Sequence, residues 1–192
     1  MMIAQRLYES GLITYMRTDS VNLSDLALGT AKEAIFETYG EKYYKFRQYH
    51  TKSKGAQEAH EAIRPTDVTR TPAAVKEFLS RDQFRLYQLI WKRFVASRMS
   101  AAQYDTTSVK IQAKDQIFTL AASRMRFDGF MSVYTQEDDK EEENVLGGNL
   151  DENSVLEFQS FDPKQHFTQP PAHYTEASLV RAMEELGIGR PS

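Results

Sequence analysis

Hydrophobic residues recur at helical spacing through the first hundred positions of the chain. Ser24 and Thr71 are residue types that cap helix N-termini, because a side-chain oxygen there can accept a free backbone N–H. Gly11 and Gly40 can end the first two helices in a left-handed conformation. The helices that this pattern predicts cover residues 1–10, 25–39, 72–79 and 81–98.

The helix over residues 81–98 has the strongest signals. Ser80 and Gln83 have the spacing of a capping box, in which each side chain accepts from the other residue's backbone N–H. The inward stripe is expected to contain Phe84, Tyr87, Ile90 or Trp91, Phe94 and Val95. The basic residues Arg85, Lys92 and Arg93 are expected on a solvated face rather than in a DNA-binding stripe.

The spacing of apolar residues becomes alternating at about residue 104. A hairpin turn is expected at Lys114 and Asp115, between two alternating runs. The predicted strands cover residues 106–112, 117–121, 127–134 and 154–160. A last helix is expected over residues 176–186, capped by Thr175 and ended by Gly187.

These elements predict an α+β chain with several domains. A helical domain over residues 1–100 would be followed by an antiparallel β domain over 101–166 and by the first helix of a further, helical domain over 167–192. The first helix begins at residue 1 without a cap, and the chain stops at Ser192 within a motif. We therefore expect a piece of a longer protein.

Composition is ordinary for a soluble globular protein, with 41% hydrophobic and 27% charged residues. No apolar run is long enough to predict a membrane span, and the absence of cysteine excludes disulfides and zinc–cysteine sites in this stretch. The net charge is -3, but residues 137–152 alone carry eight acids and one base. The remainder, with 19 acids and 23 bases, is mildly basic and compatible with DNA binding.

The first candidate chemistry lies in residues 11–20 (GLITYMRTDS). Its β-branched and aromatic residues predict an extended segment, in which side chains alternate so that Tyr15 and Arg17 point the same way. A phenol beside a guanidinium can serve as nucleophile and clamp for a phosphodiester, because the arginine fork matches two phosphate oxygens and favours the phenolate. On pattern alone, a half-buried ring beside a solvated neighbour is the commoner explanation.

Residues 58–65 (EAHEAIRP) contain a second candidate group. A short helical turn ended by the proline would place His60 and Arg64 on one face, where they could contact a phosphate. Arg64 could instead form a structural ion pair, for instance with Glu61 or Asp67.

The segment over residues 41–56 mixes aromatic and basic side chains. Such a mixture can stack unpaired bases and contact phosphates. We expect instead a loop whose rings pack on the helical domain.

Three segments together resemble one known family. Residues 11–20 are similar to the active-site segment of type IA DNA topoisomerases, and residues 58–65 resemble a second motif of that family. Residues 187–192 (GIGRPS) resemble a third motif, and the three occur in the family's order. The resemblance covers essentially the whole chain.

The resemblance implies a role for several residues. Tyr15 would attack a backbone phosphate of single-stranded DNA and become joined to the 5′ end of the cut, with Arg17 stabilising the phosphate. His60, near the phosphate that is cut, and Arg190 would be DNA contacts. Arg64 is expected as a further DNA contact from its place on the same turn as His60. No nucleotide cofactor is needed, because the covalent link stores the energy of the broken bond.

The resemblance also implies what lies outside the chain. The family binds Mg²⁺ through an acidic domain that this sequence does not contain, so we expect the fragment to bind no metal and to cleave no DNA alone. Its partners would be the single-stranded segment of negatively supercoiled DNA and the remaining domains of the enzyme. A cytoplasmic, nucleoid-associated location without membrane contact is expected.

Two other classes of protein share part of this pattern. A tyrosine recombinase also uses Tyr and Arg on DNA, but its tyrosine lies near the C-terminus after several arginines and histidines, whereas Tyr15 lies near the start. A non-catalytic DNA-binding or scaffold module, with Tyr15 merely packed, stays open.

Overall fold

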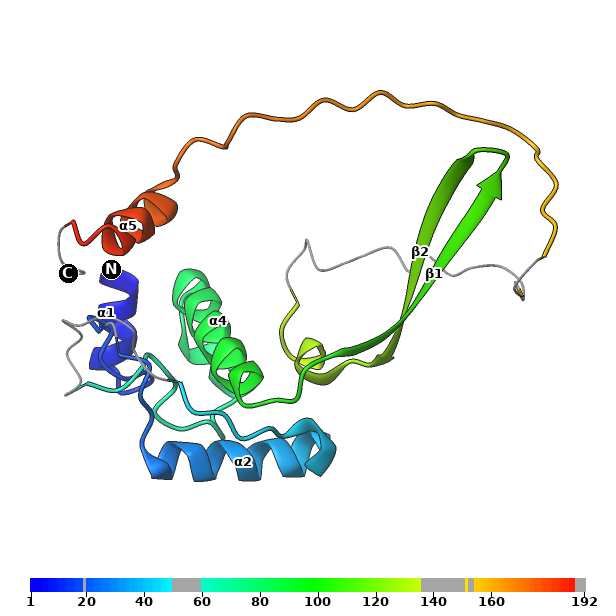
Figure 1. Ribbon diagram of the computed structural model, residues 1–192. Coiled ribbons are helices and arrows are strands. Elements are labelled where there is room, and N and C mark those ends of the chain that lie inside the picture. The colour runs from blue at the N-terminus through cyan, green and yellow to red at the C-terminus, as the bar shows by residue number, and fades with distance from the viewer. Residues whose placement is uncertain (19, 50–59, 136–150, 152–153, 189–192) are drawn as a thin grey trace. The chain divides into compact units, whose positions relative to one another are not determined.

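The chain divides into two compact units, Met1–Val145 and Leu146–Ser192. The structure is a computed structural model that describes residues 1–18, 20–49, 60–135, 151 and 154–188 (Figure 1). The first unit contains helices and an antiparallel hairpin, and the second contains one helix. The α+β class is therefore confirmed, while the domain boundaries at residues 100 and 166 stay predictions.

The predicted helices of the first unit are all present. They are α1 (Met2–Glu9), α2 (Asp25–Tyr39), α3 (Pro72–Val75) and α4 (Arg81–Ser97), with 3-10 turns at Glu41–Tyr43 and Lys76–Phe78. Ser24 and Thr71 accept backbone N–H groups as caps, and Ser80 with Gln83 forms the complete capping box. Gly11 has φ +70° and ends α1 as predicted.

The helices enclose two hydrophobic cores. One core joins α2 to α4 and contains Ala31, Ile35, Val68, Phe94, Val95, Met99 and Val133. The other joins α1 and α3 to α4 and contains Leu7, Leu12, Ile13, Val75 and Tyr87. The half-buried Trp91 packs against both cores, and its indole N–H donates to the Val68 carbonyl at 2.9 Å. Helix α4 is thus shared by both cores.

Tyr43 and Tyr44 in the aromatic segment after α2 pack on the domain, as expected, whereas Phe46 is 60% exposed. The Tyr43 hydroxyl donates to Asp128 at 2.7 Å, and the Tyr44 ring meets Phe36 edge-on at 5.6 Å between centroids. The guanidinium of Arg98 lies 5.0 Å from the centre of the Tyr49 ring. Residues 50–56 of this segment lie outside the described residues.

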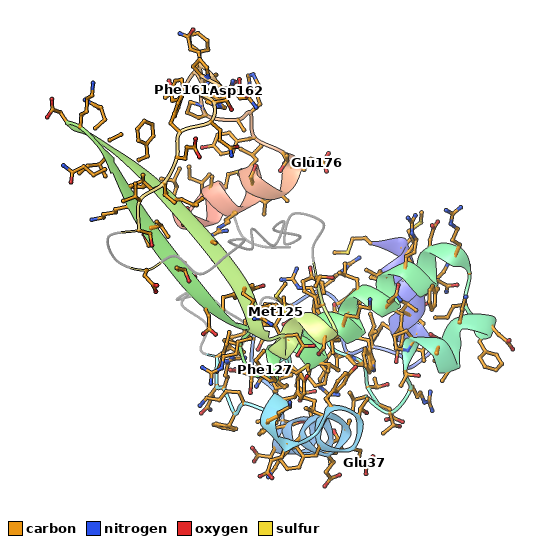
Figure 2. The ribbon with its side chains drawn as sticks, turned by 90° about the vertical axis from the view of Figure 1, so that its right-hand side faces the viewer. Glu37, Met125, Phe127, Phe161, Asp162 and Glu176 are labelled. Atoms are coloured by element: carbon orange, nitrogen blue, oxygen red, sulfur yellow. The ribbon has the colours of Figure 1, made fainter. Side chains whose placement is uncertain are left out.

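The hairpin is longer than the sequence predicts. Strands β1 (Gln103–Ala113) and β2 (Gln116–Phe127) pair antiparallel around a turn in which Lys114 has φ +54°. Val109 lies opposite Leu120 in this register. Phe127 lies at the base of the hairpin (Figure 2). Its ring packs on that of Tyr43 at 4.8 Å between centroids. This contact fixes the base of the ribbon to the helices.

The prediction of a third strand over residues 127–134 is wrong. The chain instead forms a 3-10 turn, Gly129–Ser132, in which the Phe130 N–H donates to the Ser100 carbonyl at 2.9 Å. Gly129 has φ +51°, and a Cβ there would lie 2.5 Å from the Ser100 oxygen. The alternating sequence favours a strand, but the close approach of this segment to the Ser100 carbonyl favours a turn, and the turn forms.

The second unit has one described helix. Helix α5 (Glu176–Glu185) begins after Thr175, whose hydroxyl accepts the Ser178 N–H, and Gly187 follows it with φ +70°. The predicted strand over residues 154–160 is wrong, because those residues have no regular secondary structure. Alternation alone does not provide a partner strand. Most of the acidic stretch over residues 137–152 lies outside the described residues.

Within the described ranges, no helix combines the length and the apolar character needed to cross a bilayer.

Replacing Gly129 by Ala should lower the free energy of unfolding by about 2–4 kcal/mol, because the new Cβ overlaps a carbonyl in a left-handed conformation. The matched control is Gly29→Ala, where a Cβ on α2 meets nothing within 4 Å. That substitution should raise stability by about 0.5–1 kcal/mol. Urea unfolding measures both, and equal effects would contradict the close approach at Gly129.

Tyr87 should make stability depend on alkaline pH. Burial, with the nearby charge of Asp67, raises the pKa of Tyr87 to about 12. The folded state therefore keeps this proton where the unfolded state, with a pKa of about 10, loses it, and stability should fall as pH rises from about 10 to 12. Tyr87→Phe should flatten that decline, as measured by urea midpoints across pH.

Tyr87→Phe should also lower the free energy of unfolding at pH 7 by about 1 kcal/mol, because the hydroxyl donates to the Arg70 carbonyl at 2.6 Å.

Candidate active site

The segment that carries Tyr15 is held by backbone pairing with residues 62–66. Ile13 and Pro65 form an antiparallel bridge. The Thr14 N–H donates to the Arg64 carbonyl at 2.9 Å, and the Thr66 N–H donates to the Leu12 carbonyl at 3.1 Å. The Thr66 hydroxyl adds a bond to the Gly11 carbonyl at 2.6 Å. These contacts join residues 11–14 to residues 62–66, and the two paired stretches together form the bridge segment.

The Thr14 side chain strengthens the bridge segment next to Tyr15. Its hydroxyl donates to the Ala62 carbonyl at 2.7 Å and accepts the Arg64 N–H at 2.9 Å. The Ala62 N–H in turn donates to the Asn22 carbonyl at 2.8 Å. Backbone groups on both sides of the site are thereby satisfied without water.

The bridge segment brings Tyr15 and His60 together. Their ring centroids lie 5.2 Å apart with a 45° tilt, although the residues are far apart in sequence. The half-buried Tyr15 ring also meets Tyr8 of α1 edge-on, at 5.4 Å and 70°. The His60 Nδ1 is buried and has no hydrogen-bond partner among the described residues. Sequence reasoning missed Tyr8 as a residue of the site, although it lies only three residues before the glycine that ends α1.

Arg17 lies beyond the paired part of the segment. The prediction of an extended run through Arg17 is wrong, because the chain bends at Met16 and Arg17. The pairing partners end with Thr14, so no ladder keeps the later residues extended, and the alternation argument does not apply to them. Arg17 is exposed, and within the described part of the chain no ion pair engages its guanidinium.

Arg64 has a structural role in this site. Its guanidinium pairs with Glu61 at 2.6 Å and donates to the Pro65 and Thr66 carbonyls at 2.9 and 3.3 Å. The alternative of an ion pair with Glu61 is therefore confirmed, whereas Asp67 pairs with Arg70. A DNA-contacting role for Arg64 stays a prediction, and its side chain is only 13% exposed.

The predicted helical turn is wrong for residues 60–64, which are irregular; residues 58 and 59 lie outside the described residues. The bonds to Thr14 and Asn22 occupy the backbone groups of Ala62 and Arg64 that a helical turn would need. His60 and Arg64 therefore do not share a helix face.

Glu61 connects this segment to α2. One carboxylate oxygen accepts the Ser24 N–H at 2.7 Å, and the other accepts from Arg64. Burial alone would raise the pKa of Glu61, but the hydrogen bonds from Ser24 and Arg64 outweigh it and leave the pKa below its ordinary value. The ionised carboxylate thus joins the N-terminus of α2 to the residues beside His60.

Two further predictions concern Arg190 and a metal ion. Arg190 lies outside the described residues. Within the described ranges, no group of three or more His, Asp or Glu side chains could hold a metal ion. A Mg²⁺ site in another domain of the parent enzyme stays a prediction.

Replacing Arg64 by Ala should lower the free energy of unfolding by about 1–2 kcal/mol, because it leaves a half-buried carboxylate without its partner. The control is Arg181→Ala, which breaks the exposed Arg181–Glu185 pair on α5 and should change stability by less than about 0.5 kcal/mol. Urea unfolding at pH 7 measures both variants, and an equal loss from both would contradict the structural role of Arg64.

Glu61 should make the stability of the folded chain depend on acidic pH. Its lowered folded pKa makes its contribution fully present above the ordinary carboxyl pKa of about 4.3 and lost as pH falls through the folded value. Glu61→Gln should therefore reduce the loss of stability on acidification, and an unchanged acid profile would contradict this account.

Comparison with known proteins identifies the family. A family model described as DNA topoisomerase matches residues 1–192. The structure of full-length topoisomerase I from Thermotoga maritima, in a monoclinic crystal form, is similar with a TM-score of 0.73 and 40% sequence identity. The similarity covers 99% of this chain and 31% of the Thermotoga chain, so this chain spans about a third of that protein's length. With its whole length matched, the chain belongs to the type IA DNA topoisomerase family.

Proposed function

We propose that this chain is the nucleophile-bearing part of an enzyme that relaxes negatively supercoiled DNA. The enzyme would cut one strand through a 5′-phosphotyrosine intermediate, pass another strand through the break and reseal it. The observation that carries the proposal is the contact of the Tyr15 and His60 rings, which the bridge segment holds together within a chain of this family.

Tyr15 is the proposed nucleophile. Its phenolic oxygen forms a bond to a backbone phosphorus, and the bond from that phosphorus to the 3′ oxygen breaks. The phenol loses its proton, and the departing 3′ oxygen takes up a proton to become a hydroxyl. The 3′ hydroxyl later attacks the phosphotyrosine and reverses these changes. The site supports this role because the ring is only half-buried and no other described residue hydrogen-bonds the hydroxyl.

Arg17 and His60 are proposed to act on the phosphate. Arg17 is exposed beside the nucleophile, where its guanidinium can reach two phosphate oxygens and stabilise developing negative charge. His60 contacts the Tyr15 ring and can donate a hydrogen bond to the same phosphate. Arg64 is proposed to support the position of His60 through Glu61, and Arg64 and Arg190 are proposed as further DNA contacts of the strand.

The remaining requirements lie in the rest of the enzyme. We propose that Mg²⁺ is bound by another domain, because the described residues offer no ligand cluster. The proposed partners are a single-stranded segment of negatively supercoiled DNA and the other domains, and the proposed location is the cytoplasm with the nucleoid. The chain alone should bind DNA weakly and form no adduct.

Replacing Tyr15 by Phe in the full-length parent enzyme should abolish the covalent adduct while DNA binding persists, because only the nucleophilic oxygen is lost. The measurement uses a single-stranded oligonucleotide labelled at its 3′ end with magnesium, followed by detergent denaturation and detection of labelled protein. Tyr104→Phe, on β1, is the control and should leave the adduct at its normal level.

An adduct that persists in the Tyr15→Phe enzyme would assign the nucleophile elsewhere. No adduct from the unmodified parent enzyme, together with normal DNA binding, would favour a non-catalytic DNA-binding module. A Tyr15-dependent adduct from residues 1–192 alone would show that no further domain is required for cleavage.

A further inference from the structure

A second tyrosine ring contacts that of Tyr15. Tyr8 occupies the last turn of α1, and its ring meets Tyr15 edge-on with 5.4 Å between centroids and 70° between planes. Edge-to-face contact is the arrangement that the quadrupoles of two aromatic rings favour. The pair is therefore oriented as well as close.

The end of α1 places Tyr8 where it can meet Tyr15. The Gly11 N–H donates to the Tyr8 carbonyl at 2.8 Å, and the Leu12 N–H donates to the Leu7 carbonyl at 3.0 Å. With Gly11 at φ +70°, these bonds turn the chain sharply at the end of the helix. The turn that ends the helix is thus the same turn that brings the nucleophile segment back past Tyr8.

Core packing does not account for the position of the Tyr8 ring. Its neighbour Leu7 is fully buried in the core that joins α1 to α4, whereas Tyr8 is 43% exposed and belongs to neither core. Leu7 fixes the helix, and Tyr8 is carried on that fixed helix. The Tyr8 ring therefore meets Tyr15 from a helix whose backbone the core holds in place.

The Tyr15 ring has few other restraints. Backbone pairing ends at Thr14, the chain bends at Met16, and no hydrogen bond joins the Tyr15 hydroxyl to another described residue. Among the described aromatic rings, it contacts those of Tyr8 and His60. Orientation of a reacting group strongly affects reaction rate, since small misplacements are costly.

We propose that Tyr8 is a positioning residue for the nucleophile, holding the Tyr15 ring so that its hydroxyl is aimed at the scissile phosphate. This inference rests on the proposed role of Tyr15. The aromatic ring of Tyr8 does this work, and its hydroxyl is not required, because the contact is between ring edge and ring face.

The test compares Tyr8→Ala and Tyr8→Phe in the full-length parent enzyme. Single-turnover formation of the adduct is measured at saturating 3′-labelled oligonucleotide with magnesium, and the Kd for the same oligonucleotide is measured separately. Tyr8→Ala should slow adduct formation roughly 2- to 10-fold, the range that corresponds to the loss of one aromatic pair. Its Kd should stay within about twofold of normal, and Tyr8→Phe should retain the normal rate.

Two further variants make the comparison specific. Tyr104→Ala removes a tyrosine of similar exposure, 41%, from β1 and should leave the rate unchanged. If Tyr8→Ala lowers the thermal midpoint, Tyr8→Leu replaces it, because leucine restores apolar bulk and also suits a helix but has no ring to meet Tyr15. Tyr8→Leu should then slow the reaction to the same extent.

A normal rate in a folded Tyr8→Ala or Tyr8→Leu enzyme would overturn the inference. So would a Tyr8→Phe enzyme as slow as Tyr8→Ala, because the hydroxyl would then be the active group. A weakened Kd with a normal saturating rate would make Tyr8 a DNA contact instead. Absence of any Tyr15-dependent adduct in the unmodified enzyme would overturn the proposed function and this inference with it, and that outcome is visible before any Tyr8 variant is made.

Discussion

The site depends on one short piece of backbone pairing. Residues 11–14 and 62–66 come from distant parts of the chain, and their antiparallel hydrogen bonds place the Tyr15 segment beside His60. The entropy of closing so long a loop must be offset by what the pairing buries. Leu12 and Ile13 supply that burial, because both lie in the core between α1, α3 and α4. The geometry of the candidate nucleophile is therefore set by apolar neighbours rather than by the reactive groups themselves.

The charged pair of Glu61 and Arg64 makes a second connection, between α2 and the bridge segment. Ser24 caps α2 with its side chain while its own N–H donates to Glu61, so the N-terminus of one helix is tied to the residues beside His60. Glu61 holds Arg64 at the same time, and Arg64 returns to the bridge segment through its backbone bonds to Thr14. Helix, ion pair and paired backbone form one continuous set of contacts. Glu61 has no catalytic role in the proposed mechanism. It thus supports the placement of His60, which does have such a role.

Local signals in the sequence predicted most of the helices, because their causes lie within a few residues. Ser80 and Gln83 satisfy each other's backbone groups, and Gly11 provides the left-handed turn that ends α1. The hairpin was predicted for the same reason, although its strands extend further than the alternation indicated. The resemblance of three motifs, rather than any local pattern, singled out Tyr15 and His60.

The failures have distant causes. The run after residue 127 alternates like a strand, but Gly129 approaches the Ser100 carbonyl and the chain turns instead. Residues 60–64 lose their helical turn because Thr14 and Asn22, remote in sequence, take up its backbone groups. Tyr8 was missed because a helix periodicity does not reveal which side chain the next segment will touch.

The shared position of Trp91 has a practical consequence. It is the single tryptophan of the chain, it packs against both cores, and its indole N–H bonds the carbonyl of Val68, a residue of the core between α2 and α4. Its fluorescence therefore reports on the whole helical body at once, including the core that contains Leu12 and Ile13. The emission of Trp91 can therefore be used, without an added label, to follow the packing that supports the segment of Tyr15.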